Sequence, residues 1–481
     1  MAMLGKRRPR RAPSGVSGLQ GYQEESREAS VVEGQDILYV RGLAHDGRGV
    51  ARTAQGKTVF IEGALPGENV KVAVHRTRKR FDEAHVRELL LASPERVAPP
   101  CPHFDRCGGC DLQHLALPAQ RRHKQAVLEE LLGRQGITLA ASPELLSGSG
   151  EDYRRRARLG VKVDAQGGVH LGFRARHTHR LVDIDACTVL VPALEALLVP
   201  LHQLLAELEA PRQVGHIELV ESEQAVVVVV RQLRGHGGDA GRWQAFASAQ
   251  GVHLAHWLGR ETPEFEWLTP APALHCRVPG PVEDIVLGVA PGDFLQANAE
   301  VNRLMVSTAL SWLAPLAAGE RVLDLFAGVG NFSLPLAAAG TRVTAAEGNP
   351  AMVARLGDNA RANSQGRGLD VEARQADLAD LPAVRALLQD TLPDVVVLDP
   401  PREGAEAVSR ALVEHPVARL LYISCDPATL ARDAAHLVHG GYRILCVAVA
   451  DMFVHTSHLE SMLLFEHHGS AGHIQGGSSD G

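Results

Sequence analysis

The sequence predicts a multi-domain α/β protein, and three observations along its 481 residues lead to that prediction. Alternating apolar runs and helical patterns in the C-terminal half are typical of a doubly wound, Rossmann-like sheet of parallel strands. Five short β-type runs near the N-terminus, most of them separated by Gly or Pro, favour a small closed barrel of OB-like kind. Mixed helix and strand patterns lie between these regions, and about three domains are expected for this length.

The expected domain boundaries follow changes in composition. The first 33 residues are rich in Arg, Gly and Ser, contain the run KRRPRR and lack periodicity, so we expect a disordered basic tail there. The expected segments are residues 1–33 for this tail, 34–96 for the barrel, 97–290 for a central α+β domain, 291–466 for the Rossmann-like domain and 467–481 for a second disordered tail.

Composition and charge exclude several classes of protein. No apolar run approaches the roughly 18 residues of a membrane span, and no apolar run follows the basic N-terminus as it does in a secretory signal. The seven Cys are odd in number and unevenly spaced, which indicates a reducing compartment and metal or catalytic roles for thiols. We therefore expect a cytoplasmic protein with no membrane partner. The net charge of −7 is polarised, with +7 in residues 1–80 and −14 in the rest.

Basic residues gather in two places. The first group lies on the fourth expected strand of the barrel and its turn, where Lys and Arg would neutralise phosphates. Such a run is more often a solvated strand edge, but the barrel raises RNA binding above that alternative. The first group is Lys71, Arg76, Arg78, Lys79 and Arg80, and the second is Arg154, Arg155, Arg156, Arg158, Arg174, Arg176, His177, His179 and Arg180.

Three thiols in CPHFDRCGGC, residues 101–110, form most of a metal site. Their C-x5-C-x2-C spacing, with a Gly-Gly pair that lets the loop fold tightly, is hard to attribute to unrelated core residues. Cys276 and Cys446 lie in apolar runs typical of ordinary buried thiols. Four thiolates suit either structural zinc or an iron–sulfur cluster, and the spacing does not choose between them. The candidate ligands are Cys101, Cys107, Cys110 and, as the nearest fourth thiol, Cys187.

In the C-terminal half, polar residues end successive expected strands. One strand ends at Asp324 and is followed by a Gly-x-Gly loop and a helix, the unit in which a backbone approaches a nucleoside. Glu347 follows about 20 residues later, which suits two ribose hydroxyls. Cys425 follows the apolar run LLYIS, so its thiol is expected at the carboxyl edge, where open α/β sheets bind ligands. Two further strands end at Asp377 and Asp399.

The glycine loop distinguishes two nucleoside chemistries. A dinucleotide dehydrogenase requires Gly-x-Gly-x-x-Gly, in which the third glycine helps to cradle a pyrophosphate. Here Ser333 occupies that position. The loop therefore favours S-adenosyl-L-methionine, a cofactor without phosphate.

Two resemblances to known families rest on these residues. GLAHDGRGVA, from Gly42, and ALPGE, from Ala64, resemble the TRAM domain, a small RNA-binding barrel attached to RNA-modifying enzymes. Gln-x-Asn at residues 296–298, DLFAGVGNF from Asp324, DPPR from Asp399, SCDP from Ser424 and HTSHLESMLLF at residues 455–465 occur in the order seen in RNA uracil-5-methyltransferases. The resemblance covers roughly residues 34–466. The barrel and the Cys site make the chain similar to the members of this family that act on 23S rRNA.

This resemblance implies a reaction and a set of site residues. The implied reaction moves a methyl group from S-adenosyl-L-methionine to C5 of a uridine in 23S rRNA, at the uridine 1939 site, through a covalent bond between a thiol and uracil C6. The chain is expected to act as a monomer. The implied nucleophile is Cys425 and the base Glu460; the cofactor contacts are Gln296, Phe326, Asn331, Glu347, Asp377 and Asp399; and Cys101, Cys107, Cys110 and Cys187 would hold a [4Fe-4S] cluster.

Three departures from the family pattern and two alternatives accompany this interpretation. Ala327 replaces a frequent Cys, Asp426 replaces the common Asn after the nucleophile, and Val454 replaces a frequent Pro, which would leave its loop less constrained.

One alternative function is the same chemistry on a tRNA or on a different rRNA uridine, and the barrel and Cys site argue against the tRNA form. The other is a non-catalytic RNA-binding iron–sulfur protein, against which the intact Cys425 and Glu460 argue.

Overall fold

The computed structural model describes residues 37–176, 178–364 and 368–470. The expected N-terminal tail and His177 lie outside these ranges, as do residues 471–481 of the expected C-terminal tail. The first four residues of that tail are regular, because the last strand extends to His467 and a 3-10 turn covers His468–Ser470. Among the described residues, no helix combines the length and the apolar character needed to cross a membrane.

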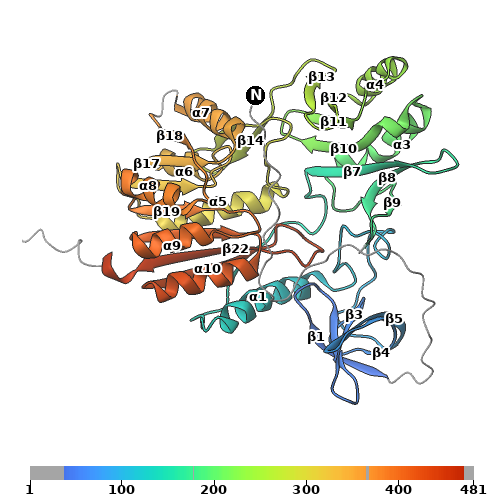
Figure 1. Cartoon of the computed structure of the whole chain (residues 1–481), viewed down its shortest axis with the longest axis horizontal. Coiled ribbons are helices and arrows are strands. Elements are labelled where there is room, and N and C mark those ends of the chain that lie inside the picture. Colours follow the sequence, from blue (N-terminus) through green and yellow to red (C-terminus); the bar gives the residue numbers. More distant parts are fainter. Residues whose placement is uncertain (1–36, 177, 365–367, 471–481) are drawn as a thin grey trace, which may run out of the picture.

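The N-terminal region forms the expected closed barrel, seen in blue in Figure 1. Its strands alternate buried and exposed residues, since successive side chains point to opposite faces of a strand, and the buried ones fill the barrel. The strands pair in the order β1-β2-β3-β5-β4. They are β1 (Leu38–Leu43), β2 (Gly49–Arg52), β3 (Thr58–Glu62), β4 (Asn69–Thr77) and β5 (Phe81–Leu91).

A buried carboxylate joins the barrel to the segment after it. Glu68 is fully buried and accepts hydrogen bonds from the backbone N–H of Leu65 at 2.8 Å and of Ser93 at 3.2 Å. Arg96 donates to both of its oxygens, at 2.6 and 2.9 Å. Burial raises the pKa of Glu68, but these hydrogen bonds together lower it by more than burial raises it, so the net shift of the pKa is downward. The Glu68 carboxylate therefore fixes the barrel to the loop that leads to the Cys run.

The middle of the chain forms a seven-stranded sheet in the order β13-β12-β11-β10-β7-β8-β9, which matches the expected α+β pattern. One face packs against α2, α3 and α4 around a core that includes Leu159, Ile217 and Leu254. The strands are β7 (Arg156–Val163), β8 (Val169–Arg174), β9 (Leu181–Asp183), β10 (Val214–Glu221), β11 (Val226–Gln232), β12 (His253–Leu258) and β13 (Glu264–Trp267), and the helices are α2 (Pro192–Glu195), α3 (Leu198–Glu207), η1 (Pro211–Gln213) and α4 (Gly237–Gln250).

The C-terminal region forms an eight-stranded sheet in the order β18-β17-β16-β19-β20-β22-β21-β6. Successive residues of β19 enter two different cores, so helices cover both faces, as the doubly wound prediction requires. Its strands are β16 (Arg321–Leu325), β17 (Arg342–Glu347), β18 (Asp370–Gln375), β19 (Val395–Leu398), β20 (Arg419–Ser424), β21 (Tyr442–Ala450) and β22 (Glu460–His467), and its helices are α5 (Ala299–Leu313), α6 (Ser333–Ala338), α7 (Pro350–Ser364), α8 (Leu381–Thr391), α9 (Glu406–Glu414) and α10 (Pro427–His439).

The prediction of an all-parallel sheet is wrong at one strand. β22 runs antiparallel to both β20 and β21, because a short connection after β21 returns the chain directly beside it. This antiparallel strand brings the start of β22 to the same edge as the end of β20. That edge is where the candidate nucleophile lies.

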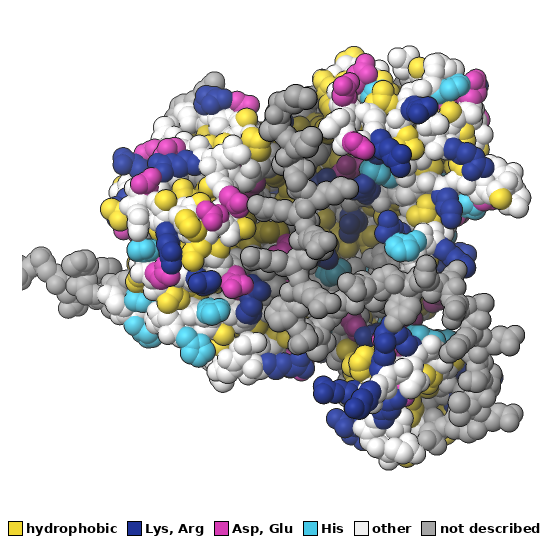
Figure 2. All heavy atoms as spheres, viewed as in Figure 1, with side chains coloured by type: hydrophobic (Ala, Val, Ile, Leu, Met, Phe, Trp, Pro, Cys, Tyr) yellow, Lys and Arg dark blue, Asp and Glu magenta, His cyan; other side chains and the backbone are white. Residues whose placement is uncertain are grey.

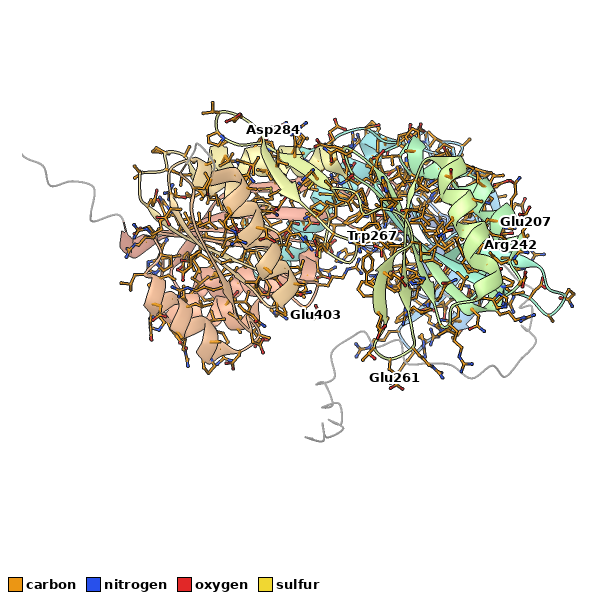
Figure 3. All side chains as sticks on the ribbon, turned by 90° about the horizontal axis from the view of Figure 1, so that it is seen from above. Glu207, Arg242, Glu261, Trp267, Asp284 and Glu403 are labelled. Carbon is orange, nitrogen blue, oxygen red and sulfur yellow. The ribbon has the colours of Figure 1, made fainter. Side chains whose placement is uncertain are left out.

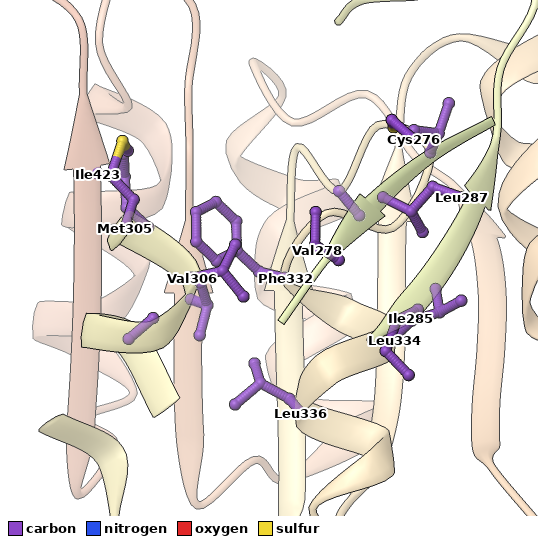
Figure 4. Packing of buried hydrophobic residues seen from close by; sticks show 14 of the residues in the cluster. Cys276, Val278, Ile285, Leu287, Met305, Val306, Phe332, Leu334, Leu336 and Ile423 are labelled. Atoms are coloured by element: carbon purple, nitrogen blue, oxygen red, sulfur yellow. The ribbon is translucent and has the colours of Figure 1, made fainter. Parts of the chain in front are cut away.

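Three segments from the expected central region pack on the eight-stranded sheet. β6 (Glu144–Leu146) adds to its edge beside β21, and α1 (Leu117–Arg134) buries Leu128 and Leu132 against the face that α9 and α10 cover. The hairpin of β14 (His275–Val278) and β15 (Ile285–Gly288) packs on the other face. Figure 4 shows its apolar side chains beside those of α5 and α6.

The two large sheets form two lobes, a C-terminal lobe on the eight-stranded sheet and a second lobe on the seven-stranded sheet, and the barrel lies below this second lobe in Figure 1. Figure 3, seen from above, separates the lobes, with Glu403 marking the C-terminal lobe and Glu207 and Arg242 marking the other. α1 lies between the barrel and α10 in Figure 1.

Candidate active site

Cys425 and Glu460 are cross-strand neighbours. β20 and β22 are antiparallel, and Ser424 pairs with Ser461. The next residues outward are Cys425, just beyond the end of β20, and Glu460, the first residue of β22, and the Glu460 charge raises the pKa of the Cys425 thiol. The thiol and the carboxylate expected to act together, 35 positions apart in the chain, are therefore side by side at the carboxyl edge of β20.

The charges around Cys425 hold it as a thiol in the free protein. Burial raises its pKa to about 12, the neighbouring Glu460 and Asp399 carboxylates raise it as well, and Arg402 lowers it. Burial also raises the pKa of Glu460 well above its usual value, and Asp399 adds to that shift. Asp399 keeps some exposure through the cavity it lines, yet burial raises its pKa to about 7. Asp399 thus raises the pKa of both Cys425 and Glu460, and the Arg402 guanidinium opposes it at both groups.

Asp426, which replaces the Asn common in the family after the candidate nucleophile, caps the N-terminus of α10. Its Oδ1 accepts hydrogen bonds from the backbone N–H of Ala428 at 3.0 Å and of Thr429 at 2.9 Å, at the start of α10. Asn and Asp cap helices about equally well, so the exchange preserves this function. Its carboxylate is directed at the first turn of the helix.

The glycine loop follows β16 in a strained conformation. Asp324 does not end the strand as expected, since β16 continues to Leu325 and the buried Asp324 accepts a hydrogen bond from Ser333 of α6. Phe326 has a φ of 63°, a left-handed conformation that non-glycine residues adopt at a cost and that often marks functional sites. Glu347 accepts a hydrogen bond from the N–H of Gly328 at 3.1 Å, so the strand-end acid and the glycine loop are in contact.

Four of the six expected cofactor contacts line one cavity in front of this loop. The side chain of Asn331 exchanges two hydrogen bonds with that of Asn302 on α5, at 2.8 and 3.0 Å. Asp377 lies apart from the cavity, exposed after β18, and its carboxylate accepts from the N–H of Ala379. Glu347 reaches the cavity through Gly328, which lines it. The four lining residues are Gln296, Phe326, Asn331 and Asp399.

Three residues of this site were not assigned a role from the sequence. Arg402 stands in the DPPR motif, and its charge lowers the pKa of both Cys425 and Glu460. Asn302 holds Asn331, and its spacing of four from Asn298 on one helix was the available signal. Arg155 was expected on a basic surface, which is wrong, because it is buried, lines the cofactor cavity with Cys276 and donates to the Gln296 carbonyl at 2.9 Å.

The loop before Glu460, Asp451–Leu459, is firmly held. The replacement of a frequent Pro by Val454 was expected to loosen it, but Val454 is fully buried and its carbonyl accepts from the Tyr153 hydroxyl at 3.0 Å. Lys124, itself fully buried, donates to Asp451 at 2.7 Å and to the Phe453 carbonyl at 2.8 Å. Side chains from outside the sheet thus replace the constraint of a proline ring.

The four candidate metal ligands surround one small cavity of about 110 Å³. Three of them lie in one loop, residues 101–111, which we call the Cys loop. This loop folds closely on β8, since the N–H of Gly108 donates to the Arg174 carbonyl at 2.9 Å and a side chain at Gly108 would meet that backbone. Arg176 was expected on a basic surface, but its guanidinium donates to the carbonyls of this loop and lies over the Phe104 ring. The cavity is lined by Cys101, Cys107, Cys110 and Cys187, together with apolar and polar neighbours.

The thiols of this cavity are costly to ionise without a cation. Burial raises the pKa of Cys110 to about 12 and that of Cys187 to about 11, and neighbouring thiols raise both further. A bound metal would deprotonate such thiols outright. Within the described ranges, no group of three or more His, Cys, Asp or Glu could hold a metal ion.

Exposed cations remain on both predicted basic surfaces. Figure 2 shows Lys and Arg side chains on the barrel and on the lobe with the seven-stranded sheet. Lys71 and Arg76 are paired with Glu88 and Glu83, whereas the β4–β5 turn is exposed. A cavity of about 350 Å³ lies where the barrel, the Cys loop, β8 and the loop before Glu460 meet. Its lining includes Arg48, Arg174, Arg176, Ser457 and His458.

Comparisons with known proteins agree with the N-terminal barrel and with the C-terminal methyltransferase-like region. Residues 31–86 match the TRAM domain family, and residues 283–468 match the tRNA (Uracil-5-)-methyltransferase family. A crystal structure of Pyrococcus abyssi tRNA (uracil-54, C5)-methyltransferase in complex with S-adenosyl-L-homocysteine has the same fold, with a TM-score of 0.68 at 24% identity, over 89% of this chain and 100% of that chain.

Two curated relatives cover nearly the whole chain. The 23S rRNA (uracil(1939)-C(5))-methyltransferase RlmD of Halomonas elongata is 63% identical over 100% of both chains. The protein of the same name from Chromohalobacter salexigens is 57% identical over 96% of this chain and 95% of its own length. The chain therefore belongs to the RlmD family of 23S rRNA (uracil-C5)-methyltransferases.

Proposed function

We propose that the protein transfers a methyl group from S-adenosyl-L-methionine to C5 of a uridine in 23S rRNA, the uridine 1939 named for its relatives. The observation that carries this proposal is the cross-strand pair of Cys425 and Glu460 beside the glycine-loop cavity, with Asp399 common to both sites. A nucleophile and a base that both interact with Asp399, which also lines the nucleoside cavity, suit group transfer to a base that has left its stack.

Cys425 serves as the nucleophile. Carbon 5 of uracil is a poor nucleophile until a thiolate adds to C6, which makes C5 enolate-like and able to take a methyl group. S-adenosyl-L-methionine supplies that methyl group and, as a sulfonium cation, a positive charge that favours the ionised forms of nearby acids. Cys425 needs that help, because its pKa is about 12 in the free protein.

Glu460 serves as the base that completes the reaction. After methylation C5 carries both the methyl group and its original hydrogen. The Glu460 carboxylate takes the C5 proton, the C–H electrons form the C5–C6 double bond, and the Cys425 thiolate leaves C6. The burial of Glu460 gives it the high pKa of a good proton acceptor.

The cofactor is held by the residues around the glycine loop. We assign the cavity-lining Gln296, Phe326, Asn331 and Asp399 to its reacting end, next to Cys425. Glu347, at the end of β17, is assigned to the ribose hydroxyls, and Asp377, after β18, to the outer part of the nucleoside.

The barrel and the second lobe bring the RNA to this site. The exposed β4–β5 turn and the arginines of the 350 Å³ cavity offer phosphate contacts along a path from barrel to catalytic loop. We propose that the segments 34–96, 97–290 and 291–466 act as RNA-binding, metal-holding and catalytic units, with α1 and β6 attached to the last. We also propose that the protein acts as a monomer in the cytoplasm.

Methyl transfer to RNA tests the proposed function directly. Labelled S-adenosyl-L-methionine is incubated with the protein and 23S rRNA that lacks the modification, and in parallel with unmodified tRNA. We expect label in 23S rRNA at one uridine and none in tRNA. Label in tRNA alone would instead support the alternative activity, the same chemistry on a tRNA.

We further propose that Cys101, Cys107, Cys110 and Cys187 hold a [4Fe-4S] cluster. The support is chemical: one buried and three half-buried thiols line one cavity, and each becomes a good ligand once a metal removes its proton. The cluster would keep the Cys loop folded on β8.

Replacing Cys187 by alanine tests the ligand set. Because it removes one of four thiolates, we expect loss of most of the iron and of the brown colour, together with a less stable second lobe. Iron and sulfide content, visible absorption and the unfolding midpoint measure this after purification without oxygen. Cys276→Ala is the matched control, since that thiol lies on β14, away from the cavity. Retained iron in Cys187→Ala with loss in Cys276→Ala would reverse the assignment.

A further inference from the structure

The loop that delivers Glu460 to the active site is held by the N-terminal half of the chain. This base loop, Asp451–Leu459, connects β21 to β22 and ends where Glu460 begins its strand. Its side chains and carbonyls receive hydrogen bonds from residues of α1, from Tyr153 and from the Cys loop. Its position relative to Cys425 therefore depends on groups far from it in sequence.

The most direct of these contacts come from Asp111, which follows the metal-ligand candidate Cys110. Its carboxylate Oδ2 accepts hydrogen bonds from the N–H of Ser457 at 3.0 Å and from the Ser457 hydroxyl at 2.9 Å. Its own backbone N–H donates to the His455 carbonyl at 2.9 Å, and so does the N–H of Leu112. One short segment thus binds the base loop at two residues, His455 and Ser457, on both sides of Thr456.

The base loop needs such external contacts. His455 has a φ of 65°, a left-handed conformation that costs free energy and persists only when its surroundings fix it. Gln120 of α1 contacts the same residue twice, at its backbone N–H and at its ring. The strained residue lies five positions before Glu460, so release of the loop would displace the base.

We propose that Asp111 is a positioning residue for the base, through which the fold of the Cys loop sets the place of Glu460. This inference rests on the proposed function. Asp111 does not contact the reacting atoms. Asp111 fixes Ser457, and thereby the start of β22, where Glu460 lies. From that position the Glu460 carboxylate takes the C5 proton while Cys425 leaves C6.

A misplaced base has a particular kinetic signature. Addition of Cys425 to C6 and methyl transfer precede proton removal, so they continue, and the methylated adduct accumulates. A displacement of about 1 Å can slow such a step by about 100-fold. A residue that merely stabilised the fold would instead lower adduct and product together.

The test compares Asp111→Ala with Asp111→Asn in the full-length protein. The alanine variant removes the acceptor of both Ser457 donors, whereas the Asn amide oxygen can accept both. With undermodified 23S rRNA and S-adenosyl-L-methionine, we expect kcat to fall about 10- to 100-fold in Asp111→Ala. We also expect the fraction of protein bound covalently to RNA in denaturing gels to rise several-fold, and Asp111→Asn to stay close to wild type.

The controls separate this inference from the proposed function. Asp105→Ala, an exposed carboxylate of the same loop that is no ligand candidate, should behave as wild type. Ser457→Ala removes only one donor and should raise the adduct less than Asp111→Ala. Wild-type levels of adduct in Asp111→Ala, whether kcat falls or not, overturn the inference and leave the proposed function standing. A wild-type protein that transfers no methyl group to 23S rRNA overturns both.

Discussion

Cys425→Ala should abolish methyl transfer, with a fall in rate of about 10⁴-fold or more, the scale expected when a covalent catalyst loses its nucleophile. Without a thiolate at C6, the C5 carbon of uracil stays too poor a nucleophile to take a methyl group. The side chain lies at the open end of β20 and is not part of the core, so the fold should survive the change. Labelled methyl transfer to undermodified 23S rRNA measures the loss.

The same variant should form no covalent complex with RNA. Cys446→Ala is the matched control, because that thiol is also half-buried but lies on β21, where it lines a different cavity. Cofactor binding, followed by calorimetry, should remain near wild type in both variants. Full activity in Cys425→Ala would falsify the covalent mechanism.

Glu460→Gln should trap the enzyme on its substrate. The amide cannot take the C5 proton, so we expect turnover to fall by about 10²- to 10⁴-fold, the usual contribution of a general base. Glu460 also raises the pKa of Cys425, and its neutral replacement therefore makes the thiolate easier to form. Addition should proceed while elimination stalls. A denaturing gel should then show most of the protein linked to RNA that already carries the labelled methyl group.

Resolution of the wild-type adduct should accelerate as the pH rises. The base acts as a carboxylate, and burial beside Asp399 raises the pKa of Glu460, so its protonated form persists at lower pH and slows the step. Asp399, with a pKa of about 7, loses its proton as the pH rises through that value, and its negative charge raises the pKa of Glu460. Single-turnover decay of the adduct between about pH 6 and 9 measures this dependence.

Glu460→Gln supplies the control for that profile. Its slow residual decay should lose the pH dependence that belongs to Glu460. An adduct that decays equally fast in both proteins would assign proton removal to another group, and Asp399 is the neighbouring acid that lines the cavity.

The sequence by itself determined the order and type of the elements. Short β-type runs separated by Gly or Pro predicted the barrel strands, and strand–loop–helix repeats predicted the sheet around Cys425. Local chemistry also identified the glycine loop and the three-thiol run. These features succeed because backbone sterics and side-chain periodicity act over a few residues, within the range that a sequence pattern displays.

Contacts between distant segments were decided only by the tertiary structure. The antiparallel course of β22 places Glu460 opposite Cys425, although from sequence alone it reads as an exposed residue of an edge strand. Arg155, expected on the surface, is buried and contacts the Gln296 carbonyl. Burial also raises the pKa values of Asp399 and Cys425.

The base loop shows the same division. HTSHLE marks it in the sequence, but the groups that hold it, Asp111 and Lys124 among them, lie more than 300 positions earlier in the chain. Packing, strand register and the exclusion of water depend on the whole fold, and they set both the geometry and the acidity of this site.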